Sequence, residues 1–386
     1  MTGRVTRDER RATTGRPAGG ERRFGPRMAR ALRCVAACLV ACAVASGSRA
    51  QPAQRLALVL PTSNRALFGD PAGYFTPTDK PEDGLREAPW QGGAYGFVRN
   101  ARRTSSGLVY TRFHEGMDVS PIYRDDRGEP LDTVVSVDDG RVVFVNSDAR
   151  ASNYGRYVVV EHRWQGSLYY ALYAHLDAPY VYPSQYLRRG AALGRLGYTG
   201  TGIDRQRAHV HVEFNVLLSE GFDEWFAMYR PRAANEHGRW NGQNMAAFDI
   251  VGLYRALASD PRLDLGDYLR DHQTAAFTVA VPGGAVLDLV QRYPWLMAEG
   301  RRGAPPPPSY EIAFTGAGFP LRVSARDVGT GTPFVMQVSP LVRYQSAPVN
   351  GYLTRRGDDF QLSQKGREYI ALISRPAPSV GAYRSW

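Results

Sequence analysis

The 386-residue sequence predicts a mainly β or α+β fold, built on an antiparallel β-sheet with a groove across one face. The first supporting observation is a series of short apolar runs, rich in Val, Tyr and Phe and separated by glycine, which is typical of strands and turns. The second is the content of 40 glycines and 26 prolines, which favours many tight connections. The predicted strands are residues 133–137, 141–146, 156–162, 168–175, 193–198 and 209–216.

Residues 1–50 have the pattern of an export signal with a basic N-terminal extension. Arginines precede an apolar run over residues 34–45, and small residues follow up to a cleavage site at Ala50. The run is too short to span a bilayer, which takes about 20 apolar residues. Met28 is an alternative start to Met1. We therefore expect an exported protein of the periplasm or cell envelope.

Most of the net charge of +11 lies in this leader. Residues 1–50 carry 11 arginines and three acidic residues, a net +8, which leaves +3 for the rest of the chain. A nearly balanced charge is not the electrostatic footprint of a nucleic-acid-binding protein. We therefore predict no nucleic-acid partner.

The three cysteines of the chain, Cys34, Cys38 and Cys42, all lie in the leader. The mature chain would then have neither a disulfide nor a thiolate metal ligand. Cys38 and Cys42 each end a stretch that resembles a lipoprotein cleavage box, and lipidation at either would bring the protein to a membrane. We favour the interpretation that they are small apolar residues of the signal. The oligomeric state stays open.

Composition divides the rest of the chain into five segments. They are an N-terminal extended segment, a sheet domain, a helical segment, a proline-rich linker and a small β-rich C-terminal region, over residues 51–89, 90–218, 219–303, 304–309 and 310–386. Apolar residues recur at helical spacing in the third segment. The first contains an apolar run interpreted as a strand, and it could lie across the groove and block it. Asp138-Asp139-Gly140 predicts a tight hairpin turn.

Three short motifs contain the residues suited to metal chemistry. They are His114-Glu115-Gly116-Met117-Asp118, Tyr173-Ala174-His175-Leu176 and His209-Val210-His211-Val212-Glu213. Each alone is weak, because a single histidine is most often a structural residue. On a strand, side chains alternate between faces, so His209 and His211 should point the same way, about 6–7 Å apart. Glu213 shares that face and could support a ligand from behind.

Histidine and aspartate together suit zinc, and three protein ligands leave a fourth position for water, as in catalytic zinc sites. Zinc lowers the pKa of such a water to about 7. Further histidines can hold the water and stabilise the oxyanion of an amide under attack. The motifs therefore favour metal-assisted amide hydrolysis.

In this order the motifs resemble the signature of the lysostaphin/LytM-type zinc metallopeptidases, a peptidoglycan endopeptidase family. The resemblance covers about residues 90–216 and includes the segments 95–100, 133–142, 154–162 and 189–200. It implies one Zn²⁺ ion held by His114, Asp118 and His211, with His175 and His209 as catalytic residues. Tyr110 lies shortly before His114 and could assist the oxyanion.

The resemblance implies a zinc-dependent endopeptidase that hydrolyses peptide cross-links of bacterial peptidoglycan, with zinc-bound water attacking the amide carbonyl. The family cleaves Gly-Gly bridges or D-amino-acid cross-links, and we favour the latter. One alternative is a non-catalytic LytM-like regulator that binds and activates another cell-wall hydrolase, but the presence of all five residues argues against it. A second is that the C-terminal region is a wall-binding or protein-binding module beside a latent peptidase.

This sequence departs from the family pattern in two loops. The family often has proline before His-x-His, where this chain has Ala208 after the charged loop of residues 202–207. A polar stretch is also inserted over residues 123–132. We expect both loops to border the groove.

Overall fold

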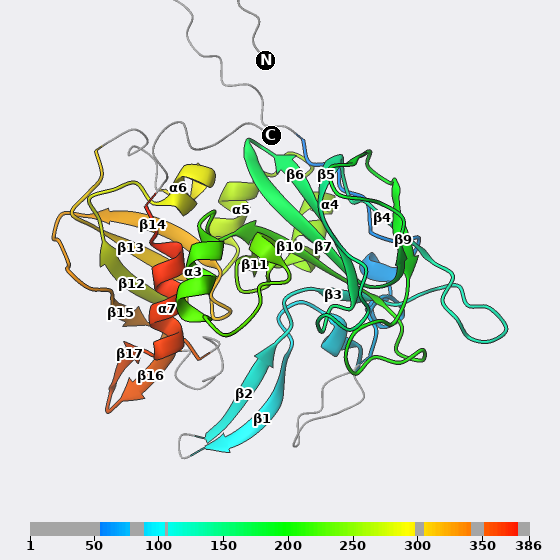
Figure 1. The fold of residues 1–386 in the computed structure, drawn as a ribbon, viewed down its shortest axis with the longest axis horizontal. Coiled ribbons are helices and arrows are strands. Elements are labelled where there is room, and N and C mark those ends of the chain that lie inside the picture. Colours follow the sequence, from blue (N-terminus) through cyan, green and yellow to red (C-terminus); the bar gives the residue numbers. More distant parts are fainter. Residues whose placement is uncertain (1–54, 78–88, 105–106, 298–304, 341–350, 377–386) are drawn as a thin grey trace, which may run out of the picture. The chain divides into compact units, whose positions relative to one another are not determined.

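The computed structural model describes residues 55–77, 89–104, 107–297, 305–340 and 351–376 (Figure 1). Contacts divide the chain into Met1–Pro52 and Ala53–Trp386, and all described residues belong to the second unit. The predicted export signal, with Cys38 and Cys42, lies outside the described residues. None of the described helices is both long and apolar enough to cross a membrane.

A nine-stranded antiparallel sheet is the centre of the fold, and Figure 1 draws most of it in green. Its main order is β11-β10-β7-β6-β5-β8, while β3 pairs with β10 and β9 joins β7 to β4. The six strands predicted over residues 133–216 are all present, so the predicted fold class is confirmed. The strands are β3 (Met117–Val119), β4 (Thr133–Val135), β5 (Gly140–Asn146), β6 (Arg156–Trp164), β7 (Ser167–Pro179), β8 (Tyr186–Leu187), β9 (Ala192–Leu196), β10 (Val210–Leu217) and β11 (Met245–Ala247).

The two faces of this sheet differ in chemistry because side chains alternate along each strand. On β10, Val210, Val212 and Phe214 are fully buried in the main hydrophobic core. His211 and Glu213 point to the opposite face. The apolar face therefore anchors the strand that presents the polar residues, as the alternation predicted.

The hairpin predicted at Asp138-Asp139-Gly140 is wrong. β4 pairs with β9, whereas β5 pairs with β6 and β8, so the two strands that flank this turn do not pair with each other. Gly140 serves a close approach instead. A Cβ atom at Gly140 would lie 2.6 Å from Nδ1 of His162 and 2.7 Å from the carbonyl oxygen of Glu161. The glycine therefore allows β6 to pack closely on β5.

The prediction of a helical segment over residues 219–303 is correct only in part. The helical spacing of apolar residues predicted for this segment is present in α4. Two strands, β11 and β12, lie in the same segment. The helices of this segment are α3 (Phe222–Tyr229), η3 (Gly238–Trp240), α4 (Ile250–Ser259), α5 (Leu265–Asp271), α6 (Asp288–Arg292) and η4 (Pro294–Leu296). The strand β12 spans Phe277–Pro282.

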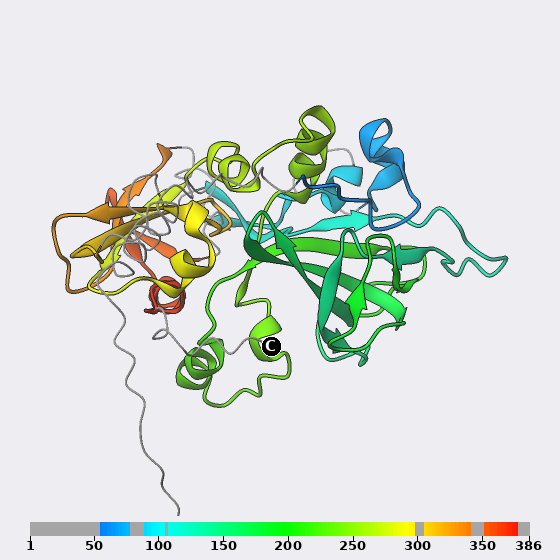
Figure 2. The same ribbon diagram turned by 90° about the horizontal axis from the view of Figure 1, so that it is seen from above.

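The proline-rich stretch at residues 304–309 does not separate two regions, because β12 pairs with β13 immediately after it. A second antiparallel sheet has the order β14-β13-β12-β15, drawn in yellow and orange in Figure 2. Alternating apolar residues explain the pairing, since Phe277 and Val279 are buried opposite Phe314 and Ile312. These strands are β13 (Ser309–Phe314), β14 (Pro320–Arg326) and β15 (Phe334–Val338).

The C-terminal region is β-rich as expected, but it also contains a helix. A small two-stranded sheet of β16 (Leu353–Arg356) and β17 (Asp359–Leu362) precedes α7 (Gln364–Ile373). Ser363 caps α7, because its side chain accepts a hydrogen bond from the Gly366 N–H. Tyr369, Ile370 and Leu372 on α7 are buried in the main core, so this helix belongs to the same folded unit as the large sheet.

The N-terminal segment does not block the groove with its described residues. Residues 55–60 run alongside the large sheet without forming a strand, with the Val59 N–H donating to the Val137 carbonyl. Further on, Phe75 bridges to Val119 at the outer edge of β3. None of residues 55–77 lines the groove described below. The short helices here are η1 (Ala66–Phe68), α2 (Pro71–Tyr74) and η2 (Pro89–Gly93), followed by the hairpin of β1 (Val98–Thr104) and β2 (Gly107–Phe113).

Candidate metal centre

His114, Asp118 and His211 converge at one buried point. β3 pairs with β10 so that His211 lies directly opposite Asp118, and His114 sits in the turn just before β3. His114 Nε2 is 3.0 Å from Asp118 Oδ1, and His211 Nδ1 is 2.8 Å from the same oxygen. The two ring nitrogens are 3.2 Å apart. Three potential ligand atoms therefore meet within one small volume.

The far nitrogens of both rings are fixed by hydrogen bonds. His114 Nδ1 lies 2.9 Å from the Ala94 carbonyl oxygen, and His211 Nε2 lies 2.8 Å from Glu213 Oε1. These oxygens only accept, so the far nitrogens carry the hydrogens. The other two nitrogens then turn lone pairs towards the Asp118 carboxylate. Three acceptors in mutual contact require a positive charge between them.

The donor set fits zinc. Ligand atoms about 2.0–2.1 Å from a tetrahedral Zn²⁺ are about 3.3 Å from one another, close to the 2.8–3.2 Å separations here. Two imidazole nitrogens and one carboxylate oxygen are suitable zinc ligands, and three protein ligands leave a fourth position open. His114, Asp118 and His211 are therefore the residues that could hold the ion.

The electrostatics of the cluster also call for a cation. Burial raises the pKa of Asp118, but the nearby His114 and His209 outweigh it and hold that pKa well below its ordinary value. Burial lowers the pKa of His211, yet the hydrogen bonds that its ring donates to Asp118 and Glu213 raise that pKa to about 10. Without a metal, a proton on His211 supplies the positive charge that balances the carboxylates of Asp118 and Glu213. A bound cation would take the place of that proton.

His175 and His209 form a second histidine pair beside the first, with ring centroids 4.8 Å apart. His175 Nδ1 donates to the Thr199 carbonyl at 2.8 Å, and His209 Nδ1 donates to the Arg207 carbonyl at 2.7 Å. Both Nε2 atoms therefore keep lone pairs, and His209 Nε2 lies 3.5 Å from Asp118 Oδ1. Burial lowers the pKa of both histidines, so both rings are neutral at pH 7.

A bulge in β7 aims His175 at this site. Strict alternation would put His175 on the same face as Tyr173, in the main core. Opposite β6, however, Arg156 pairs with Leu176 and Val158 with Tyr173, so β7 contains one extra residue. His175 takes up the irregularity with a left-handed φ of 61°. Its ring consequently lies on the polar face with His209, an arrangement that no strand periodicity predicts.

Glu213 supports His211 from behind, where the sequence placed it. Its Oε1 also accepts from the Tyr154 hydroxyl at 2.7 Å, and its Oε2 accepts from Asn215 Nδ2 at 3.1 Å. The sequence reasoning missed Tyr154 and Asn215. Asn215 continues the alternating polar positions of β10 and could have been found from that pattern. Tyr154 is 59 residues away from Glu213, so no local signal identifies it.

The side chain of Tyr110 lies outside the described residues, and only its backbone position in β2 is known, opposite Ala101. The suggestion that Tyr110 assists the oxyanion therefore stays a prediction.

All five predicted metal and catalytic residues line one groove of about 980 Å³. Gly202, Ile203 and Arg207 form part of its wall, as expected for that loop. The inserted loop at residues 123–132 does not line the groove, contrary to expectation. Arg124 instead donates to the Arg205 carbonyl at 2.7 Å, so the inserted loop packs behind the other loop and supports it.

Comparison with known proteins finds one family whose model matches the part of the chain that contains this site. Residues 112–221 match the model of peptidase family M23, which confirms the resemblance predicted from the histidine motifs for this part of the chain. The match supports a hydrolase of the peptidoglycan-peptidase kind. No curated protein matches the chain.

Solved structures similar to the chain include a zinc-containing peptidase from Vibrio cholerae, with 26% identity and a TM-score of 0.22. That similarity covers 37% of this chain and 36% of the Vibrio protein, so the chain spans about a third of that relative's length. The catalytic domains of the prophage-encoded M23 protein EnpA from Enterococcus faecalis and of lysostaphin from Staphylococcus simulans have 22% and 21% identity. The similarity to the EnpA domain covers 32% of this chain and 86% of that domain, with a TM-score of 0.22. The similarity to the lysostaphin domain covers 33% of this chain and 84% of that domain, also with a TM-score of 0.22. Similarity at this level carries no information on activity.

Proposed function

We propose that the part of the chain matching peptidase family M23 is a zinc-dependent endopeptidase that hydrolyses peptide cross-links of bacterial peptidoglycan. The observation that carries the proposal is the orientation of four imidazoles. Each is anchored through one nitrogen to an oxygen, and each turns its other nitrogen towards the Asp118 carboxylate or the groove. Structural histidines have no need for such a common orientation.

The roles within the site follow from these contacts. His114, Asp118 and His211 would hold the ion, which when bound supplies Lewis-acid chemistry, acidifying water and polarising a carbonyl. His175 and His209 are neutral and present Nε2 lone pairs to the groove. Their Nε2 atoms can accept a proton from the attacking water and return it to the departing amine. Glu213 keeps His211 in the tautomer that a metal ligand needs.

The choice of peptidoglycan as substrate rests on the family match. The choice of the periplasm or cell envelope as location rests on the leader sequence. Within that choice we favour D-amino-acid cross-links over Gly-Gly bridges, because we recognise no wall-binding repeat in the sequence.

The test compares wild type with His114→Ala and His209→Ala, measuring zinc content and the products of digesting purified cell wall. We expect His114→Ala to lose both zinc and hydrolysis. We expect His209→Ala to keep zinc and lose hydrolysis by about 10²- to 10⁴-fold, the range for removal of a general acid or base. A wild-type protein that binds no zinc, or digestion that is unchanged in both variants, would overturn the proposal.

The alternative, a non-catalytic regulator of another hydrolase, makes a different prediction. His209→Ala should then leave the activation of the partner hydrolase unchanged, because regulation would depend on the surface and not on proton transfer. The deep burial of all five residues favours the enzyme, since a surface regulator has no need of a buried histidine cluster.

A further inference from the structure

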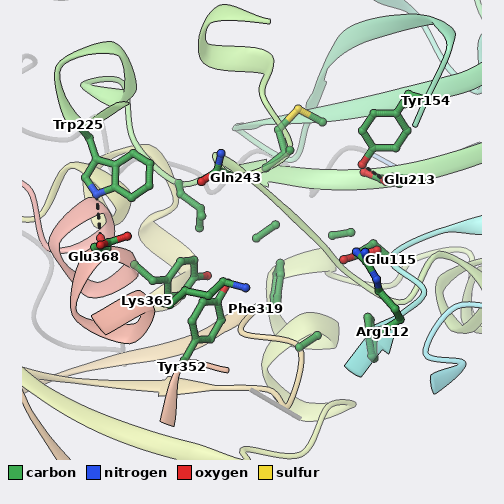
Figure 3. Close-up of a pocket in the computed structure, with 18 of the residues that line it drawn as sticks. Arg112, Glu115, Tyr154, Glu213, Trp225, Gln243, Phe319, Tyr352, Lys365 and Glu368 are labelled. Atoms are coloured by element: carbon green, nitrogen blue, oxygen red, sulfur yellow. Dashed lines mark hydrogen bonds between the residues drawn. The ribbon is translucent and has the colours of Figure 1, made fainter. Parts of the chain in front are cut away.

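The loop between α3 and β11, residues 230–244, forms part of the wall of the metal groove although it lies beyond the M23 match. Its residues in that wall are His237, Asn241 and Gly242. The loop then continues along a neighbouring cavity of about 330 Å³, and Figure 3 shows Gln243 in the wall of that cavity. The groove therefore includes residues that the family match does not account for.

Packing and hydrogen bonds fix this loop on the face of the large sheet that carries the metal centre. Trp240 packs on Tyr170 of β7, which shares that face, with ring centroids 4.9 Å apart. Asn244, at the end of the loop, is fully buried and donates from Nδ2 to the Ser219 carbonyl oxygen at 2.9 Å. A loop held at its middle and at its end keeps His237 in a defined place, as precise contact with a substrate requires.

The ring of His237 is held through one nitrogen only. Its Nδ1 lies 2.7 Å from the hydroxyl oxygen of Tyr157, and the ring lies against the rings of Tyr157 and Phe144. Among the described residues, none forms a hydrogen bond with Nε2 of His237, and this atom keeps contact with solvent. Because the partly exposed ring lines the groove, Nε2 is the polar atom that a ligand there can reach.

The position of the hydrogen on the His237 ring follows from the surroundings of Tyr157. Tyr157 is only 1% exposed, and the described residues offer its hydroxyl no other partner. If Nδ1 donated, the phenolic hydrogen would be buried without an acceptor, which destabilises the fold. The hydroxyl therefore donates to Nδ1. Burial lowers the pKa of His237, so the ring is neutral at pH 7 and carries its hydrogen on Nε2.

We propose that Nε2–H of His237 donates a hydrogen bond to a main-chain carbonyl oxygen of the peptide whose amide lies at the metal centre. A neutral donor suits a neutral carbonyl. Asn241 supports this role, because it accepts from the Gln243 N–H at 3.0 Å and donates to Asn235 Oδ1 at 3.3 Å, which leaves one amide hydrogen for the same peptide. The inference rests on the proposed peptidase function, and it assigns substrate binding to a loop outside the M23 match.

Two substitutions separate recognition from structure. His237→Gln keeps a donor near the place of Nε2 but offers no acceptor at the place of Nδ1, whereas His237→Asn keeps the acceptor and loses the donor. For a purified cross-linked muropeptide dimer, we expect His237→Asn to raise KM about three- to tenfold at unchanged kcat, the loss of one hydrogen bond in uniform binding. His237→Gln should keep KM near the wild-type value and unfold at lower urea concentration, because the Tyr157 hydroxyl loses its partner.

The matched control is Glu236→Gln, since Glu236 is exposed and lines neither the groove nor the neighbouring cavity. It should leave KM and kcat unchanged. A purely structural role for His237 predicts the reverse order, with His237→Asn near wild type and His237→Gln impaired. A wild-type KM in His237→Asn, or an equal rise of KM in His237→Gln, would overturn the inference.

Binding can also be read without hydrolysis. Labelling the seven histidines of the full chain with ¹⁵N lets long-range ¹H–¹⁵N correlation spectra report the tautomer of each ring, and His237→Gln assigns the His237 signals. In the presence of zinc, the His209→Ala variant keeps the muropeptide dimer intact. We expect the Nε2–H tautomer at His237, and a shift of its Nε2 signal when the dimer is added. His272 does not line the groove and is the internal reference. An Nδ1–H tautomer, or a shift no larger than that of His272, would contradict the proposal.

The two proposals fail separately. Hydrolysis of cell wall, with a wild-type KM in His237→Asn and no shift at His237, refutes the binding residue and leaves the peptidase intact. A protein that binds no zinc and hydrolyses nothing, but whose His237 signal shifts with the dimer, refutes the peptidase and supports a peptide-binding groove.

Discussion

His175 has a left-handed backbone, with φ of 61°, in the middle of a strand. This conformation costs a residue with a Cβ atom about 1 kcal/mol or more, whereas it costs glycine almost nothing. The surrounding sheet over-determines the geometry, because the His175 N–H donates to the Tyr154 carbonyl and β6 is in register on either side. Strain is thus stored at a residue to which we assign a role in proton transfer.

This strain predicts a reversal of the usual order of stabilities. In an ordinary strand, glycine is less stable than alanine by about 0.5–1 kcal/mol. At position 175 we expect His175→Gly to be more stable than His175→Ala by about 1 kcal/mol, because alanine must hold the left-handed conformation. Urea unfolding of the two variants measures the difference. If alanine proved the more stable, the left-handed backbone would not exist in solution.

His162 is another buried histidine, on β6, and it does not line the groove. It is a packing residue, fully buried and stacked on Trp164 with ring centroids 5.1 Å apart. Its Nδ1 donates to the Asp139 carbonyl at 2.9 Å. Burial lowers the pKa of His162 to about 4, although Asp138 and Asp139 oppose the shift.

The lowered pKa predicts a specific loss of stability in acid. The neutral ring is favoured in the folded state, so this contribution is intact above pH 6.5 and is lost as the pH falls towards 4. Over that window we expect His162 to account for about 3 kcal/mol of the fall in unfolding free energy. His162→Phe should flatten the profile of unfolding free energy against pH by this amount, whatever its stability at pH 8. An unchanged slope would mean that water reaches the ring.

At the scale of elements, β10 presents three polar residues in alternation along one face, with the candidate ligand His211 among them. Glu213 holds Nε2 of His211, and Tyr154 holds Glu213, so a tyrosine from the loop before β6 orients a ligand on β10. Partners of this kind fix the tautomer and the ring orientation of a metal-binding histidine.

Removing the hydroxyl of Tyr154 should therefore weaken the metal site without unfolding the protein. We expect Tyr154→Phe to lower zinc affinity by about 10- to 100-fold, the range for partners behind a ligand. Competition with a chelator measures the affinity. Tyr157→Phe is the matched control, because the Tyr157 hydroxyl bonds to His237 at 2.7 Å and does not touch Glu213. Equal losses in both variants would point to general disturbance of this face instead.

The elements also show what the sequence could reveal. Period-two alternation predicted β10 and the common face of its histidines, because that signal is local. The bulge that turns His175 inwards depends on the register between β6 and β7, and the partner of Gly140 is a ring on another strand. The pairing of β12 with β13 crosses a proline-rich stretch that looked like a boundary. Each of these errors concerns a contact between residues distant in sequence, which periodicity and composition do not encode.

At the scale of the folded unit, regions beyond the M23 match secure the end of β10. Arg292 of α6 donates to the carbonyl oxygens of Leu217 and Leu218 and pairs with Asp288 at 3.0 Å. The side chains of Arg292 and Asp288 are only 12% and 4% exposed. The neighbouring Tyr293 hydroxyl accepts from the Leu217 N–H. The strand that presents His211 therefore ends on residues from the segment predicted to be merely helical.

Breaking this buried pair should destabilise the whole unit and not one part of it. Arg292→Met leaves the Asp288 carboxylate buried without its cation, which costs about 3–5 kcal/mol. Because α6, α7 and β10 share one hydrophobic core, we expect a single unfolding transition at lower urea concentration, seen alike by tryptophan fluorescence and by circular dichroism.

Two comparisons isolate the cause. Adding Asp288→Leu to Arg292→Met should recover much of the loss, because the uncompensated charge is removed. Arg141→Met breaks a more exposed pair with Glu161 and should cost about 1 kcal/mol or less. Were the C-terminal region a separate module beside a self-sufficient peptidase, Arg292→Met would split the unfolding into two transitions and leave zinc bound through the first. A single transition that releases zinc would instead mean that the sheet carrying the metal ligands needs residues 219–376 in order to fold.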